Sequence, residues 1–117
     1  MGRLSTHVLD TVNGGPAAGI AITLDRLGPG GLRERVAEAV TNADGRTDAP
    51  LLSGRLETGI YELSFAIGAY FGRLGIPLPE PAFLDVVPLR FGIAEPEGHY
   101  HVPLLASPSS YSTYRGS

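Results

Sequence analysis

Glycine and proline interrupt this sequence at short intervals along its whole length. Sixteen glycines and ten prolines are spread over 117 residues. Both residue types are poorly tolerated inside long helices and are common in turns, so the chain is expected to form many short elements joined by turns. Such a pattern is typical of an all-β fold. The length suits one domain over residues 1–117, with a single hydrophobic core.

The composition excludes several classes of chemistry. With 43% hydrophobic and 18% charged residues, the chain resembles soluble globular proteins. It has no cysteine, which excludes a disulfide framework, a thiolate nucleophile and a cysteine-rich zinc site. All nine cationic residues are arginine, so lysine Schiff-base chemistry is excluded, and a small planar anion would instead meet the fixed fork of a guanidinium group.

Charge and hydropathy also limit the partners and the location of the chain. A net charge of −3 without a basic stripe argues against binding to nucleic acid. Residues 1–7 contain no apolar core of a signal peptide. The longest uncharged apolar-rich run, residues 63–72, is about half of the ~20 residues that a membrane helix needs. The sequence therefore predicts a cytoplasmic protein that does not contact membranes.

Hydrophobic alternation and turn residues predict the elements. Residues 20–27 alternate with a period of two, which is typical of a strand with one buried face. Asp44 and Gly45 are typical of a hairpin turn at residues 42–45. A proline at position 88 predicts an edge or bulged strand. We predict two antiparallel sheets packed face to face, with seven to eight strands and one short helix at 69–74. The other predicted strands are residues 4–11, 58–67, 83–91, 100–105 and 111–114.

Residues 32–41 give contradictory signals. Leu32, Val36 and Val40 recur at helical spacing, and the arginine, glutamate and alanine residues between them favour a helix. The neighbouring segments, however, predict a β meander. We therefore predict a strand here, against the local propensity.

The three histidines are the candidates for proton transfer near neutral pH. His7 lies in the first predicted strand, whereas His99 and His101 flank Tyr100 in a late one. Because side chains alternate across a strand, His99 and His101 should share one face, with Tyr100 on the other. Each could equally be an ordinary surface histidine. Two histidines at i and i+2 with a third from another strand could also hold zinc, and spacing alone leaves that alternative open.

Three other features have less specific interpretations. Ser5, His7 and Asp10 contain the residue types of a hydrolase triad, but Ser5 and His7 lie one pleat apart on one strand and Asp10 points to the opposite face, so we reject a triad. Arg46 alone is most simply a solvated charge. The polar and aromatic C-terminus, residues 111–117, could be an ordinary frayed end.

Four stretches, in this order along the chain, resemble the 5-hydroxyisourate hydrolases, which are transthyretin-related enzymes. They are residues 4–11 (LSTHVLDT), 45–48 (GRTD), 99–105 (HYHVPLL), and 107–108 (SP) with the terminal 114–117 (YRGS). Residues 16–19 and 83–88 extend the resemblance over the whole chain. The hormone-carrying transthyretins share the fold but lack the first-strand histidine and the terminal tetrapeptide, both present here, so the resemblance is to the enzymes.

The resemblance implies a transthyretin-like β-sandwich that assembles as a homotetramer, a dimer of dimers. Active sites in this family lie in a channel at the dimer–dimer interface, and each is built by more than one subunit. The implied reaction is the hydrolysis of 5-hydroxyisourate to 2-oxo-4-hydroxy-4-carboxy-5-ureidoimidazoline (OHCU) in urate breakdown, without a cofactor or a metal. A binding module without activity and a histidine-dependent metal protein are the competing hypotheses.

The resemblance also implies the residues of the site. It makes His7, Arg46, His101 and Ser117 the catalytic set, with Tyr114 as a substrate contact beside His7 and Arg46. One of the two histidines would take a proton from water and the other would polarise a carbonyl or protonate nitrogen. Which histidine has which role stays open, and so does the role of His99.

Overall fold

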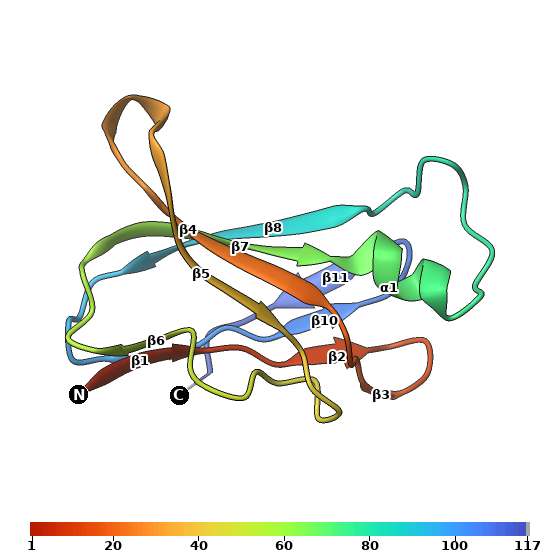
Figure 1. Cartoon of the computed structure of the whole chain (residues 1–117), viewed down its shortest axis with the longest axis horizontal. Helices are drawn as coiled ribbons and strands as arrows, with labels where there is room; N and C mark the ends of the chain where they lie inside the picture. Colours follow the sequence, from red (N-terminus) through yellow and green to blue (C-terminus); the bar gives the residue numbers. More distant parts are fainter. Residues whose placement is uncertain (117) are drawn as a thin grey trace.

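The computed structural model describes residues 1–116 and consists mostly of short strands (Figure 1). Ser117 lies outside the described residues. In chain order the elements are β1 (Gly2–Ser5), β2 (Val8–Asp10), β3 (Gly15–Pro16), β4 (Ala21–Leu27), the 3-10 turn η1 (Pro29–Gly31), β5 (Arg33–Val40), β6 (Leu52–Gly54), β7 (Gly59–Ala66), α1 (Ile67–Arg73), β8 (Val86–Ile93), β9 (His99–His101), β10 (Leu104–Ala106) and β11 (Tyr111–Thr113).

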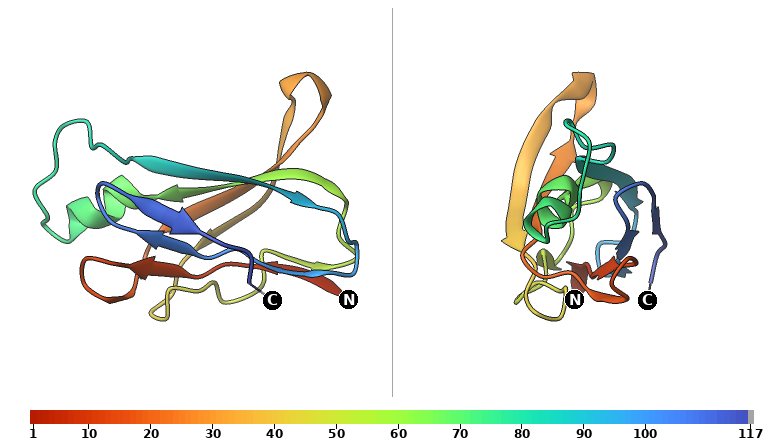
Figure 2. Two further views of the ribbon diagram at one scale, coloured as in Figure 1. Left: turned by 180° about the vertical axis from the view of Figure 1, so that it is seen from behind. Right: turned by 90° about the vertical axis from the view of Figure 1, so that its right-hand side faces the viewer.

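One layer of the sandwich is an antiparallel sheet with the order β5-β4-β7-β8. The strand β8 lies at its edge, which confirms the edge position predicted from Pro88, because an edge strand has one side on which no amide donor is required. At the opposite edge, the tip of the β4–β5 hairpin, which contains η1, extends away from the other strands (Figures 1 and 2).

The second layer contains the strand groups β6-β1-β9 and β3-β2-β10-β11. The pairs β1–β9 and β2–β10 are parallel and keep the same register, and backbone bonds from Val102 to Ser5 and from Leu104 to His7, each 2.9 Å, connect them. Residues 2–10 therefore follow one path beside residues 99–106. The predicted strand 4–11 is interrupted at Thr6 and His7, and this central pairing is parallel, whereas the other pairs are antiparallel.

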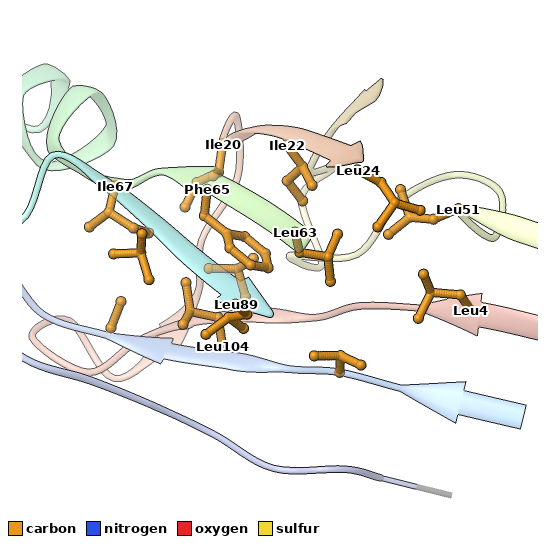
Figure 3. Close-up of a cluster of buried hydrophobic side chains, with 14 of the residues drawn as sticks. Leu4, Ile20, Ile22, Leu24, Leu51, Leu63, Phe65, Ile67, Leu89 and Leu104 are labelled. Atoms are coloured by element: carbon orange, nitrogen blue, oxygen red, sulfur yellow. The ribbon is translucent and has the colours of Figure 1, made fainter. Parts of the chain in front are cut away.

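The core lies between the two layers. Leu4 and Leu104 from one layer meet Leu24, Leu63 and Phe65 from the other, and all five side chains are fully buried (Figure 3). The alternation on β7 shows why the sequence folds this way, since its odd-numbered residues from 61 to 65 are buried apolar side chains. These features confirm the predicted β-sandwich of two packed layers.

The strand prediction for residues 32–41 is confirmed as β5, against the local helical propensity. Pairing with β4 along its length satisfies the backbone, and its charged residues find partners across the sheet. Arg35 is ion-paired with Asp25, and Arg33 contacts Asp25 and Glu62 at 3.3 and 3.1 Å. Cross-strand charge pairs of this kind stabilise a sheet, and they join Arg33 and Arg35 to residues of β4 and β7 that an isolated helix over 32–41 would not contact.

The short helix is also confirmed, beginning two residues before the predicted start, at Ile67. It is the longest helix among residues 1–116, and none of the described helices has the length and hydropathy needed to cross a membrane.

Candidate active site

A polar hollow of about 290 Å³ opens on the outer face of the layer that contains β1 and β9. Alternation along the strands creates this face. On β1, Arg3 and Ser5 point outward, and in the parallel register they lie beside His99 and His101. Residues between them point inward and are buried. The expectation that His99 and His101 share one face is therefore confirmed. The lining residues are Arg3, Ser5, Arg46, His99, Tyr100 and His101.

The imidazole of His101 is half-buried within this hollow. Its Nδ1 lies 2.9 Å from the Oγ of Ser5. Burial lowers the pKa of His101, and the positive charges of Arg46, His7 and Arg3 lower this pKa further. His101 is consequently held in its neutral form at neutral pH, when it can accept a proton.

His7 lies between β1 and β2 and forms an isolated antiparallel bridge with Arg46. Its Nε2 donates a hydrogen bond to the backbone carbonyl of Asp44 at 2.9 Å. A carbonyl can only accept, so Nε2 must carry the hydrogen, and Nδ1 is the nitrogen that can accept when His7 is neutral. The structure thus brings His7 next to Arg46 and fixes its tautomer.

The turn after β5 delivers Arg46 to this site. The side-chain oxygen of Asn42 accepts hydrogen bonds from the backbone amides of Asp44 and Arg46, at 2.9 and 3.2 Å. Gly45 has a φ of +74°, and a side chain there would collide with the carbonyl of Val8. The predicted turn and its positive φ are confirmed, but the chain then pairs with His7 rather than with the preceding strand.

The C-terminal segment is attached to the strand that carries the two late histidines. The amide of Gly116 donates to the carbonyl of His101 at 2.7 Å. The Arg115 guanidinium lies 4.1 Å from the centre of the Tyr100 ring and donates to the carbonyl of His99 at 3.2 Å. The interpretation of a frayed end is therefore wrong for residues up to Gly116. The predicted catalytic Ser117 lies outside the described residues.

Tyr114 is not brought into the polar hollow of this chain. Its side chain is 59% exposed and borders a second hollow, of about 400 Å³, between the edge strands β8 and β11. That hollow is lined mainly by apolar groups, including Leu89, Phe91 and Tyr111. The substrate contact expected of Tyr114 stays a prediction.

Asp10 and His99 are the residues on which the two alternatives, a hydrolase triad and a metal site, depend. Asp10 is buried and accepts a hydrogen bond from the Tyr70 hydroxyl at 2.7 Å. Its carboxylate therefore has a partner other than His7, which supports the rejection of the triad. His99 directs its Nε2 to the carbonyl of Met1 at 3.0 Å. The three histidines thus face different partners, and within residues 1–116 no three histidine, aspartate or glutamate side chains are grouped as a metal site would require.

Comparison with known proteins places this geometry in a family. The model of the HIUase/Transthyretin family matches residues 4–116. The chain belongs to this family. It is 59% identical to a 5-hydroxyisourate hydrolase of Ralstonia nicotianae over the full length of both chains. The resemblance to these enzymes described from the sequence is confirmed.

Two solved structures agree with this assignment. The 5-hydroxyisourate hydrolase of Klebsiella pneumoniae is 39% identical and superposes with a TM-score of 0.82 over all of both chains. A crystal structure of (S)-allantoin synthase is 51% identical, with a TM-score of 0.93 over 99% of this chain. This chain spans only 44% of the length of that synthase, so the likeness concerns one part of it.

The sequence did not point to two residues that line the polar hollow of this chain, Arg3 and Ser5. From the sequence, Ser5 enters only as the nucleophile of the rejected triad, whereas its hydroxyl contacts His101 on the neighbouring strand. A signal was present, because Arg3, Ser5 and His7 are spaced by two and share one face of an extended chain. What the spacing could not reveal was the parallel neighbour that completes the face.

Proposed function

We propose that the chain hydrolyses 5-hydroxyisourate to OHCU in urate degradation. The relatives that match it over its full length carry the name of this enzyme. The observation that carries the proposal is the polar hollow, in which a half-buried His101 with a lowered pKa lies beside Arg46. Such a site offers a proton acceptor and a cation to a small polar substrate.

The reaction needs few components, because the substrate is a reactive cyclic ureide. One of the two histidines, His7 or His101, removes a proton from water while the water oxygen attacks the ring acyl carbon. The carbon–nitrogen bond of the ring then breaks, the departing nitrogen receives a proton, and the acyl carbon becomes the carboxyl group of OHCU. The other histidine polarises the carbonyl or supplies that proton.

The remaining predicted residues hold the substrate and the developing charge. Arg46 supplies fixed positive charge and paired donors to substrate oxygens, a geometry that lysine does not reproduce. Ser117 is proposed to hold the attacking water. In the sequence it directly follows Gly116, whose amide donates to the carbonyl of His101, and this supports the proposal. Tyr114 is proposed as a substrate contact.

We further propose that the active form is a homotetramer, a dimer of dimers, in which more than one subunit builds each site. Two features of the single chain support assembly. The strands β8 and β11 are at the edges of their sheets, and the hollow between them is lined mainly by apolar groups. Partner subunits would cover these edges and the apolar hollow, and the polar hollow, which is open in the single chain, would need a partner to enclose a substrate. We expect this assembly in the cytoplasm, which fractionation of cells would test.

The proposal is tested by adding the protein to freshly generated 5-hydroxyisourate and following its ultraviolet absorbance. We expect decay much faster than the spontaneous reaction, with OHCU as the product. Heat-inactivated protein and a folded variant that lacks both His7 and His101 are the controls. Decay of the substrate at the control rate would remove the proposed function.

A further inference from the structure

Two contacts on opposite sides of the His101 ring determine which of its nitrogens is accessible. On one side, Nδ1 lies 2.9 Å from the Oγ of Ser5. On the other, the backbone of Gly116 approaches so closely that a methyl group on it would lie 2.9 Å from Cδ2 of the ring. The remaining nitrogen, Nε2, is the ring nitrogen without a partner among the contacts of the described residues. It is therefore the nitrogen that can meet a ligand in the hollow.

The sheet itself, and not only a flexible side-chain contact, sets the separation of Ser5 and His101. The two residues are paired in the parallel register of β1 and β9. The amide of Val102 donates to the carbonyl of Ser5 at 2.9 Å, and the hydroxyl of Thr6 donates to the carbonyl of Val102 at 2.7 Å. Because Thr6 is buried, this connection is shielded from water. The serine hydroxyl is consequently preorganised beside the imidazole.

We propose that Ser5 is a positioning residue, which accepts a hydrogen bond from Nδ1–H of His101 and so leaves the lone pair of Nε2 in the hollow as the base that activates water. This inference rests on the proposed hydrolysis and deepens it, because it assigns the base among the two histidines. Ser5 does not touch the reacting atoms; it acts through the tautomer and the orientation of His101.

The charges around the hollow favour this tautomer. Among residues 1–116, its lining contains the guanidinium groups of Arg3 and Arg46, which only donate hydrogen bonds, and no carboxylate. Nε2 of His7 already donates to Asp44, and His7 is not among the lining residues. An attacking water needs an acceptor for its proton, and the lone pair of His101 Nε2 provides one in the lining itself.

The proposal is tested first by kinetics of two substitutions at position 5. Ser5→Ala removes the hydroxyl, and we expect kcat to fall about 10- to 100-fold with a smaller change in KM, which is the scale of losing a group that orients a catalytic one. Ser5→Thr restores a hydroxyl on a strand that accommodates β-branched residues, so activity should return to within a few-fold of the original. Ser53→Ala, an exposed serine on the adjacent strand β6, is the matched control and should change nothing. Circular dichroism verifies folding of each variant.

The second measurement does not depend on turnover. Nitrogen-15 NMR of the histidine side chains in the unsubstituted protein should show the proton of neutral His101 on Nδ1, and Ser5→Ala should shift His101 toward a mixture of tautomers. A proton on Nε2 in the unsubstituted protein, or unchanged kcat and spectra in Ser5→Ala, would overturn the proposal. Absence of any turnover by the unsubstituted protein would instead remove the hydrolysis, and with it the base role, while the spectra still decide whether Ser5 sets the tautomer.

Discussion

His7 and Arg46 face each other across an isolated antiparallel bridge, although one belongs to the N-terminal strand path and the other to the turn after β5. The amide of Val8 strengthens this junction by donating to the carbonyl of Gly45 at 2.8 Å. These backbone contacts thus fix the positions from which the side chains of His7 and Arg46 reach the site. Rigid placement of this kind is what a site requires if it is to act on a substrate in a single orientation.

We predict that Arg46→Lys is strongly impaired although the charge is retained. Lysine lacks the planar fork and cannot make paired hydrogen bonds to substrate oxygens, so kcat/KM should fall by roughly two orders of magnitude. Arg55→Lys is the matched control, because Arg55 is 77% exposed and outside the hollow. Nearly full activity of Arg46→Lys in the absorbance assay would make Arg46 a surface charge and refute its assigned role.

We predict that the acidic limb of the pH–rate profile lies below the ordinary histidine pKa of about 6.5. His101 must be neutral to accept a proton, and burial together with the charges of Arg46, His7 and Arg3 lowers its pKa. Activity is therefore retained as the pH falls to 6.5 and is lost only as it falls through the lowered pKa. Arg3→Gln removes one of these charges, so the limb should move to higher pH, whereas Arg55→Gln should leave it in place. The measurement is kcat/KM against pH, which reports groups of the free enzyme. A limb that stays fixed in Arg3→Gln would show that His101 is not the titrating base.

Much of the fold could be predicted from local patterns. Alternation fixed the faces of β4 and β7, and Asp44 with Gly45 identified the turn. The edge position of β8 followed from Pro88, because a proline in a central strand would lack a ladder bond. Residues 32–41 were harder, since the partners that support a strand there lie on other strands: Asp25 on β4, and Glu62 on β7, which is 29 positions from Arg33.

The candidate site was predicted less completely, for a physical reason. The resemblance named His7, Arg46 and His101, but the contact between Ser5 and His101 arises from a parallel pairing of two strands whose residues are 96 positions apart. Alternation shows which residues share a face of one strand, yet it carries no information about which strand lies beside it. That information came only with the three-dimensional structure.

We predict that Tyr70→Phe destabilises the fold by about 1–3 kcal/mol, because a buried carboxylate loses a donor. Burial would raise the pKa of Asp10, but hydrogen bonds from Asn13, Tyr70 and Val12 outweigh it, so this pKa is lowered. A lowered carboxyl pKa contributes stability above the ordinary value, and this contribution is lost as the pH falls through the lowered one. The cost of Tyr70→Phe should therefore be full at neutral pH and smaller in acid. The reference variant is Tyr61→Phe, which removes a hydroxyl that donates to the neutral backbone carbonyl of Glu57. The free energies of unfolding of the two variants are measured at the same protein concentration. A cost no greater than that of Tyr61→Phe would contradict the role given to Asp10.

We predict a particle of about four times the 12.3 kDa subunit, with loss of activity on dissociation. Tyr111→Lys adds a charge to the edge strand β11, beside the apolar hollow that it shares with Phe91, and should shift the protein to smaller species. Light scattering with a concurrent absorbance assay measures both properties. The exposed control Arg55→Lys should remain tetrameric and active. A monomer that retains full activity would contradict assembly of the site from several subunits.

The last prediction concerns the C-terminal residues 114–117, which would be dispensable if they were an ordinary chain end. The amide of Gly116 binds the carbonyl of His101, and Arg115 lies over the ring of Tyr100, so the segment is directed along the strand that carries the proposed base. Deleting all four residues should abolish turnover, while the melting temperature falls by only a few degrees and the tetramer persists, because the exposed segment contributes little to the core.

Deleting Ser117 alone tests its assigned role, since it keeps the contacts of Gly116 and Arg115, and it should lower kcat while leaving the melting temperature unchanged. A C-terminal affinity tag should also reduce the rate, because it adds bulk close to Gly116, whose amide donates to the carbonyl of His101. The proteins are matched for folding by circular dichroism and compared in the same absorbance assay. Equal rates for the full-length and the truncated chains would leave the tetrapeptide without a role in the reaction.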